Sequence, residues 1–337
     1  MKNKIEIKKY IPKPHRREIF TIILLFSEIF IFSIISPNFL SFKNLETVLR
    51  NSTDLAVVSI GMTIVMVLGG IDISVGSSLG VVAILVGWML QAEVNPFLIG
   101  LIAIISGILI GTINGLLVTK ARIPAIIATL GSSNILRAMV FGMLGGRWLT
   151  GLPNDFGLFT KGHIAGIPIP VFLLAAFYLL FWLFLTYTSA GRHIYAVGNS
   201  TEATKLAGIN TDRTVILAFA LLGSLVGFSA LIYVGRLASV EITVGIDLPM
   251  AAIAASVIGG TSVKGGKGSV IGTLAGVLFI AIMKNGIVLL GIPSLWERAV
   301  VGLLIVISVL VDLIVGNRSE KKQREQLSRQ RLKILGN

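Results

Sequence analysis

The sequence predicts an all-α, polytopic membrane protein with about ten transmembrane helices, some of them broken. Hydrophobic residues make up 54% of the 337 residues, and the mean hydropathy is +0.90. Charged residues make up only 13%, whereas soluble domains carry roughly 25%. Apolar runs of membrane-spanning length recur along the chain between short polar turns. Little sequence is left for a soluble domain.

Ten apolar segments account for the predicted spans. The first is expected at residues 19–35 and contains Glu28, whose carboxylate is costly in lipid and should face protein or a water-filled path. A structural hydrogen bond to a neighbouring helix is the favoured role for Glu28. The other nine segments are expected at about residues 55–68, up to 90, 96–118, 123–144, 169–186, 215–234, 248–258, up to 290, and 299–315.

A glycine-rich break separates the second and third spans. Residues 44–50 precede the second span as a short amphipathic connector, and residues 69–80 follow it with one Asp, three Ser and four Gly. Non-helical backbone at membrane depth is tolerated where it is buried in protein or lines a cavity. Asp72, Ser74 and Ser77 are therefore candidates for the translocation path, together with Asn134 of the fifth span. The alternative is that Asp72 or a serine only caps the third span.

Two further features indicate close helix packing and an internal repeat. Gly107, Gly111 and Gly115 recur at four-residue spacing in the fourth span, which lets another helix approach closely. A second glycine-rich break at residues 259–269 resembles the first. The similarity hints that spans two to five repeat as spans seven to ten. Transporter folds often contain such repeats, with the path at the repeat interface.

The longest polar interruption lies at residues 187–214 and contains a short predicted helix. Asn199 can cap this helix, Glu202 occupies its third position and Gly208 can end it. An apolar face of Ala203, Leu206 and Ala207 is expected at i, i+3, i+4 spacing. Because two helical turns are marginal alone in water, this face should dock on something. It is either an ordinary surface helix or a docking element for a partner protein.

The distribution of basic residues predicts the topology. A net charge of +13 could indicate nucleic-acid binding, but most of the 29 Lys and Arg residues lie at the chain ends and in short loops beside apolar spans. Placing both termini in the cytoplasm puts most of them on the inner side, as the positive-inside rule requires. The expected organisation is a basic cytoplasmic tail at residues 1–18, a transmembrane domain at 19–316 and a second basic tail at 317–337. The polar stretch at 187–214 is then cytoplasmic.

Motifs for catalysis and cofactor binding are missing from the sequence. The chain has no cysteine, which excludes disulfides, thiolate metal sites and thiol catalysis. Residues 260–269 do not match a phosphate-binding loop, because Thr261 replaces the first required glycine and Gly268 follows Lys267. The three histidines are far apart in the sequence, and there is no nucleophile elbow. Neither an enzyme nor a cofactor or metal is expected. No cleavable signal is expected in the basic, proline-interrupted start of the chain.

Several motifs, in order, resemble the permease subunits of bacterial sugar ABC importers of the ribose, xylose and autoinducer-2 family. They are IDISVGS at 71–77, AVGN at 196–199 followed by Glu202-Ala203 and Gly208-Ile209, VIGGTS at 257–262 and GGKGS at 265–269. The resemblance covers nearly the whole chain. It implies a bacterial inner-membrane protein in which two permeases, identical or different, pair above two ATP-binding subunits. A periplasmic or lipid-anchored binding protein then delivers the solute. The ATPase-coupling loop carries over to these positions: Gly191, Arg192, Asn199, Glu202, Ala203, Leu206 and Gly208.

The transported molecule is less defined. RIPAIIATLG at 122–131, GGRW at 145–148 with GLP at 151–153, and Ile292-Pro293 with Trp296 resemble the autoinducer-2 branch. Rhamnose and ribose permeases are the near alternatives. Two other classes of protein remain: an ion-coupled secondary transporter, for which Glu28, Asp72, Arg137 and Lys284 could relay protons, and a membrane-embedded enzyme or scaffold.

Overall fold

The structure is a computed structural model that describes residues 16–310 except 154, 294, 308 and 309. Apart from one two-stranded hairpin, the named elements in this part of the chain are helices. The first six are α1 Arg16–Ile35, α2 Phe42–Val67, α3 Val75–Gln91, α4 Pro96–Thr119, α5 Ala125–Leu144 and α6 Gly157–Lys161. After the hairpin follow α7 Ile169–Tyr187, α8 Ser189–Asn199, α9 Thr201–Leu206, α10 Thr211–Leu237, α11 Leu248–Ile258 and α12 Val270–Leu289. Residues 295–307 are also helical.

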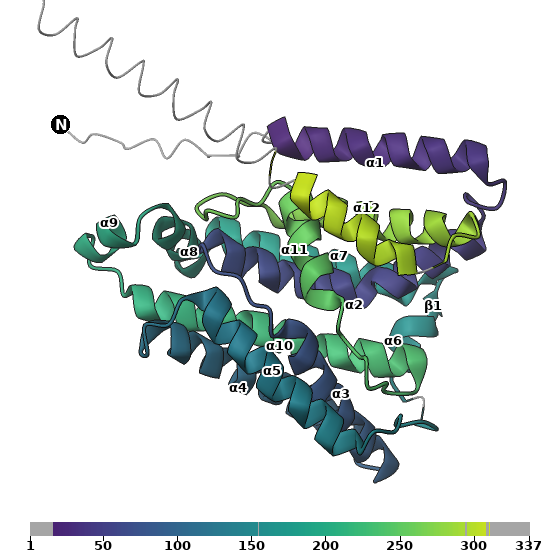
Figure 1. Ribbon diagram of the computed structural model, residues 1–337, viewed down its shortest axis with the longest axis horizontal. Helices are drawn as coiled ribbons and strands as arrows, with labels where there is room; N and C mark the ends of the chain where they lie inside the picture. Colours follow the sequence, from purple (N-terminus) through teal and green to yellow (C-terminus); the bar gives the residue numbers. More distant parts are fainter. Residues whose placement is uncertain (1–15, 154, 294, 308–309, 311–337) are drawn as a thin grey trace, which may run out of the picture.

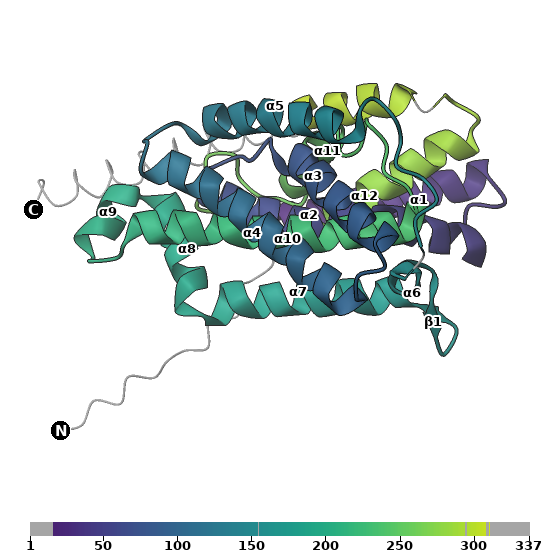
Figure 2. The ribbon, with the colours of Figure 1, turned by 90° about the horizontal axis from the view of Figure 1, so that it is seen from below.

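The helices form a single bundle around α2. In Figure 1, α1 runs along one edge beside α12, and α4, α5 and α10 lie on the opposite side. Helix α2 lies between these groups and contacts α7, α10, α11 and α12. Most of its apolar stretch is buried inside the protein. α8 and α9 lie at one end of the bundle, and α6 and the hairpin lie at the other end (Figures 1 and 2).

Six of the described helices are long and apolar enough to cross a membrane: α2, α4, α5, α7, α10 and α12. Shorter apolar helices stand where the first, third and eighth spans are expected, at Thr21–Ile35, Val75–Gln91 and Leu248–Ile258. The last expected span, 299–315, extends past the described residues. The helical content and the several apolar helices confirm the prediction of an all-α membrane protein with multiple spans. The number of ten spans stays a prediction.

The structure corrects the predicted start of the second span. Residues 44–50 are not a separate connector, because α2 is one continuous helix of 26 residues. Ser41 caps it by accepting a hydrogen bond from the Asn44 backbone nitrogen. Glu46 and Arg50 pair one turn apart, which stabilises the polar first turns as helix. The polar composition marks the part of α2 that extends beyond the apolar core.

The predicted glycine ridge of α4 is confirmed as a helix-packing surface. A Cβ atom added at Gly107 would lie 2.1 Å from the Gly223 carbonyl oxygen of α10, and one added at Gly111 would lie 2.2 Å from that of Phe219. Such distances leave no room for any side chain. α4 and α10 therefore pack backbone against backbone, as small residues permit in membrane helices.

The hairpin marks the end of the bundle at which α2 begins. β1 His163–Ile164 pairs antiparallel with β2 Ile167–Pro168. The connecting residues Ala165 and Gly166 have φ of 51° and 80°, as tight two-residue hairpin turns require. The His163 Nε2 atom lies 2.9 Å from the Glu46 carboxylate of α2. α2 thus runs from the hairpin end to the α8 end of the bundle.

Candidate functional site

A helix pair, a buried polar cluster and a charged pocket

Helices α8 and α9 form a helix pair at the end of the bundle. The Thr188 Oγ1 atom accepts a hydrogen bond from the Gly191 nitrogen at 3.0 Å and caps α8. The Ser200 Oγ atom accepts one from the Ala203 nitrogen at 3.2 Å and caps α9. Gly208 has a φ of 79° just past the end of α9, a conformation that favours glycine.

The sequence prediction missed α8 and misplaced the cap of α9. Asn199 is the last residue of α8, and Ser200 is the cap. A cap must have non-helical backbone, and Ser200 has φ −162° and ψ 108°. The signal for α8 was present in Gly191, Ile194 and Val197, which share one face at i, i+3, i+6 spacing and are all buried.

The two helices of the pair face opposite environments. Gly191 of α8 is buried so closely that an added Cβ would lie 2.6 Å from the Leu185 backbone. In contrast, Leu206 of α9 is 90% exposed, and Ala203, Ala207 and Glu202 are exposed too. The predicted apolar face of α9 therefore exists and is uncovered in the described chain.

Tight backbone contacts join α8 to the rest of the bundle; we call the residues Val67, Gly198, Gly265 and Gly266 the glycine junction. The Gly266 nitrogen donates to the Val67 carbonyl oxygen at 2.8 Å. A Cβ added at Gly198 would lie only 1.8 Å from that same oxygen. Tyr195 of α8 also donates its hydroxyl to the Gly268 carbonyl oxygen at 2.8 Å.

The glycine junction links the two glycine-rich breaks noted in the sequence. The end of α2 leads into the first break, and Gly265 and Gly266 belong to the second. These contacts are backbone to backbone, so no side chain separates α8 from the end of α2 or from the 259–269 turn. The helix pair is thus mechanically connected to helices at the centre of the bundle.

Two of the four candidate path residues, Asp72 and Ser74, share a buried polar cluster at the first break, and Ser77 is buried nearby with a separate partner. The Asp72 Oδ1 atom accepts hydrogen bonds from the Ser74 nitrogen at 2.8 Å and from its hydroxyl at 2.6 Å. Asn114 of α4 donates to the Ser74 hydroxyl at 2.8 Å. Ser77 is buried and shares a hydrogen bond with Ser133 at 3.2 Å.

The fourth candidate, Asn134, is exposed on α5 and is not part of this cluster. Asp72 binds the backbone and hydroxyl of Ser74, the residue that precedes α3, but no side chain caps this helix. The polar groups of this cluster at the helix break are hydrogen-bonded to other groups of the protein. A path role for Asp72, Ser74, Ser77 and Asn134 stays a prediction.

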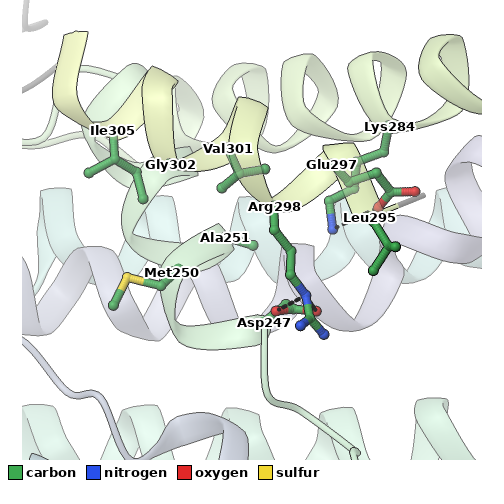
Figure 3. A pocket seen from close by; sticks show the side chains of 10 residues that line it. All are labelled: Asp247, Met250, Ala251, Lys284, Leu295, Glu297, Arg298, Val301, Gly302 and Ile305. Carbon is green, nitrogen blue, oxygen red and sulfur yellow. Dashed lines mark hydrogen bonds and ion pairs between the residues drawn. The ribbon is translucent and has the colours of Figure 1, made fainter. Parts of the chain in front are cut away.

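A charged pocket that the sequence did not indicate lies among α2, α10, α11 and α12. The loop at 243–247 and the helical residues 295–305 also line it. It consists of two adjoining cavities of about 480 Å³ and about 320 Å³ that share Asp247, Ala251, Lys284 and Glu297. Figure 3 shows the smaller cavity, with Arg298 reaching towards Asp247 and Lys284 beside Glu297. Thr47 and Asp54 of α2 line the larger cavity, so the charged pocket lies towards the hairpin end.

Ion pairs line the charged pocket. Arg236 lies 3.0 Å from the Asp54 carboxylate, Lys284 lies 3.6 Å from that of Glu297, and Arg298 lies 2.9 Å from that of Asp247. In sequence these residues stand in separate spans and loops. No local pattern joins them, which is why sequence reasoning did not identify the site.

The described residues contain no group of three or more His, Cys, Asp or Glu side chains that could hold a metal ion. The first candidate site is a helix with an exposed apolar face, and the second is a polar cavity of about 480 Å³ that adjoins a smaller one.

Comparison with known proteins shows which family the chain resembles along most of its length. A family model described as the branched-chain amino acid transport system / permease component matches residues 44–309. The chain is 37% identical over 309 residues to the ribose import permease protein RbsC of Escherichia coli (strain K12), covering 90% of this chain and 96% of that protein. It is also 37% identical over 290 residues to RbsC of Bacillus subtilis (strain 168), covering 86% and 90%.

A second kind of relative matches almost as well. Identity to the autoinducer 2 import system permease protein LsrC of Salmonella paratyphi B (strain ATCC BAA-1250 / SPB7) is 36% over 278 residues, covering 82% of this chain and 80% of that protein. No solved structure matches the chain.

Proposed function

We propose, from the premise that this chain belongs to the permease family of ABC importers, that it carries a small sugar or sugar-like molecule across the bacterial plasma membrane. The chain is a transmembrane permease subunit and not an enzyme. Ribose and autoinducer 2 are the candidate solutes, because the relatives' names give these two. Rhamnose is a further candidate from the sequence resemblance.

The observation that carries the proposal is the helix pair. An apolar side chain that is 90% exposed, Leu206, lies on a two-turn helix that could not persist alone. The same unit is fixed through the glycine junction to α2. This is the arrangement needed for a separate ATP-binding subunit to push on the membrane helices. We assign Gly191, Arg192, Asn199, Glu202, Ala203, Leu206 and Gly208 to this coupling loop.

The remaining parts of the proposal concern topology and partners. Both termini and the helix pair are cytoplasmic, as the distribution of Lys and Arg favours. Ten segments cross or enter the membrane, and the shorter apolar helices Thr21–Ile35, α3 and α11 are among them. The partners are an ATP-binding subunit, a second permease and a periplasmic or lipid-anchored binding protein.

Ion-coupled transport has less support. Asp72 is hydrogen-bonded to Ser74, Lys284 pairs with Glu297, and Arg137 donates to the carbonyl oxygens of Ile242 and Val244. These groups stabilise local structure rather than forming a relay. Glu28 Oε2 is buried with no hydrogen-bond partner among the described residues, and the structural hydrogen bond expected for the Glu28 carboxylate stays a prediction.

Uptake by the complete importer tests the proposed solute. Proteoliposomes containing this permease, its ATP-binding subunit and its binding protein should accumulate at least one of labelled ribose, rhamnose and autoinducer 2. Labelled leucine is the control, because it represents the solute class in the family description. Accumulation of leucine without any of the three would contradict a sugar-type substrate.

A further inference from the structure

The charged pocket is large enough to hold a small solute. Its larger cavity has a volume of about 480 Å³, and small-molecule sites are usually clefts of about 300–1,000 Å³. Its walls come from α2, the end of α10, residues 243–248 and α12. It is distinct from the Asp72 cluster, whose cavity holds only about 10 Å³.

The ionised groups that line the charged pocket balance each other. Each of the three carboxylates, Asp54, Asp247 and Glu297, has its own basic partner. A net charge in a cavity draws in ions of the opposite sign, and a charged ligand would have to compete with a pair already formed. The described lining therefore has no net charge that would attract either an anion or a cation.

Neutral hydrogen-bonding groups also line the larger cavity. Asn51, Thr47, Thr243 and Asn285 contribute amide and hydroxyl groups to the larger cavity, and such groups both donate and accept. The Arg236 guanidinium lies 5.9 Å from the centre of the Tyr233 ring and donates to Asn51 and Asp54, so the polar wall is held in place.

Apolar side chains complete the cavity. Leu55, Ala281 and Val288 line it next to the polar groups. A molecule with several hydroxyl groups on a carbon ring matches this mixture, since its hydroxyls can bond to paired ions and amides while its C–H faces touch the apolar wall. A free amino acid matches it less well, because its ammonium and carboxylate would both need partners that are already paired.

We propose that the charged pocket is a solute-binding site that selects uncharged, polyhydroxylated molecules through its balanced ion pairs. This proposal rests on the proposed function, from which ribose is chosen as the probe. It adds a binding site within the permease itself. The solute enters beside Asn51 and Thr243 and is held between α2, α10 and α12.

Single cysteines provide the test, because the chain has none of its own. Thr47→Cys and Thr243→Cys each place one thiol at an exposed position of the pocket wall. Gln91→Cys is the matched control, since Gln91 is exposed at the end of α3 and does not line the pocket. The permease and its ATP-binding subunit are reconstituted without the binding protein, so that no docked protein can shield the thiols.

The measurement is the rate of labelling by a membrane-impermeant thiol reagent with and without ribose. At a ribose concentration about ten times the Kd, occupancy alone should slow labelling of the two pocket thiols about elevenfold. Gln91→Cys should label at an unchanged rate. Ribose 5-phosphate and leucine, as charged and zwitterionic probes, should not protect.

The outcomes separate the pocket from the proposed function. If the complete importer accumulates ribose but ribose protects neither pocket thiol in any nucleotide state, the pocket is not the binding site and the permease function stands. Equal protection by ribose 5-phosphate or leucine would refute selection of uncharged molecules. If the complete importer accumulates neither ribose nor the other sugars, the proposed function itself is wrong, and with it the pocket proposal that rests on it.

Discussion

Gly223→Ala is expected to destabilise the protein strongly, although it adds only one methyl group. The added Cβ would lie 2.1 Å from the Gly107 carbonyl oxygen, and a backbone atom cannot rotate away. α4 and α10 would have to separate along their closest contact. Overpacking of this kind costs about 1–3 kcal/mol and occasionally more. Thermal unfolding of the purified variant in detergent should show a clearly lower transition temperature and a lower yield of folded protein.

Gly142→Ala is the matched control for this change. Gly142 is also helical, in α5, but nothing lies within 4 Å of the position a Cβ would take. Alanine favours a helix interior over glycine by about 1 kcal/mol, so this variant should be as stable as the original or slightly more stable. Equal transition temperatures for the two variants would show that α4 and α10 are not packed as closely as described.

Leu206→Asp is expected to abolish coupling while leaving the permease folded. Leu206 is 90% exposed in the isolated chain, so an aspartate there disturbs no contact within the protein. In the assembled importer the same position would place an unpaired charge in an apolar contact. Such a charge costs several kcal/mol when buried, and about 1.4 kcal/mol corresponds to a tenfold loss of affinity. Uptake and solute-stimulated ATP hydrolysis should fall to near background.

Gln91→Asp controls for the charge itself, because it adds the same group at an exposed site outside the helix pair. It should leave uptake and stability unchanged. Ala203→Asp lies on the same face of α9 and should reproduce the loss seen for Leu206→Asp. If the ATP-binding subunit still copurifies with Leu206→Asp and hydrolysis is still stimulated by solute, the helix pair is not the docking element.

Much of the helical architecture could be predicted because its signals are local. Apolar runs located the membrane helices, and the ridge of Gly107, Gly111 and Gly115 indicated a close helix contact that the structure places against α10. The start of α2 was predicted less well. Its polar first turns suggested a separate segment, whereas the Ser41 cap and the Glu46–Arg50 pair continue the helix without interruption.

The two functional features depend on contacts between distant parts of the chain. Gly198 belongs to the AVGN motif of the family resemblance, but its structural role depends on the Val67 carbonyl oxygen that lies against it. The charged pocket depends likewise on Asp54 meeting Arg236 and on Lys284 meeting Glu297. In the sequence Lys284 is a candidate for a proton relay, and no local motif links it to the other three charges. Only the fold shows that they pair around a cavity.

The energy source of uptake distinguishes an ABC permease from an ion-coupled transporter. Proteoliposomes containing the permease, its ATP-binding subunit and its binding protein are supplied with ATP, and a proton ionophore then collapses the gradient. Solute accumulation should continue under these conditions and should stop when the ATP-binding subunit is inactivated. Accumulation driven by an ion gradient in liposomes that contain this chain alone, without ATP, would contradict the ABC permease mechanism.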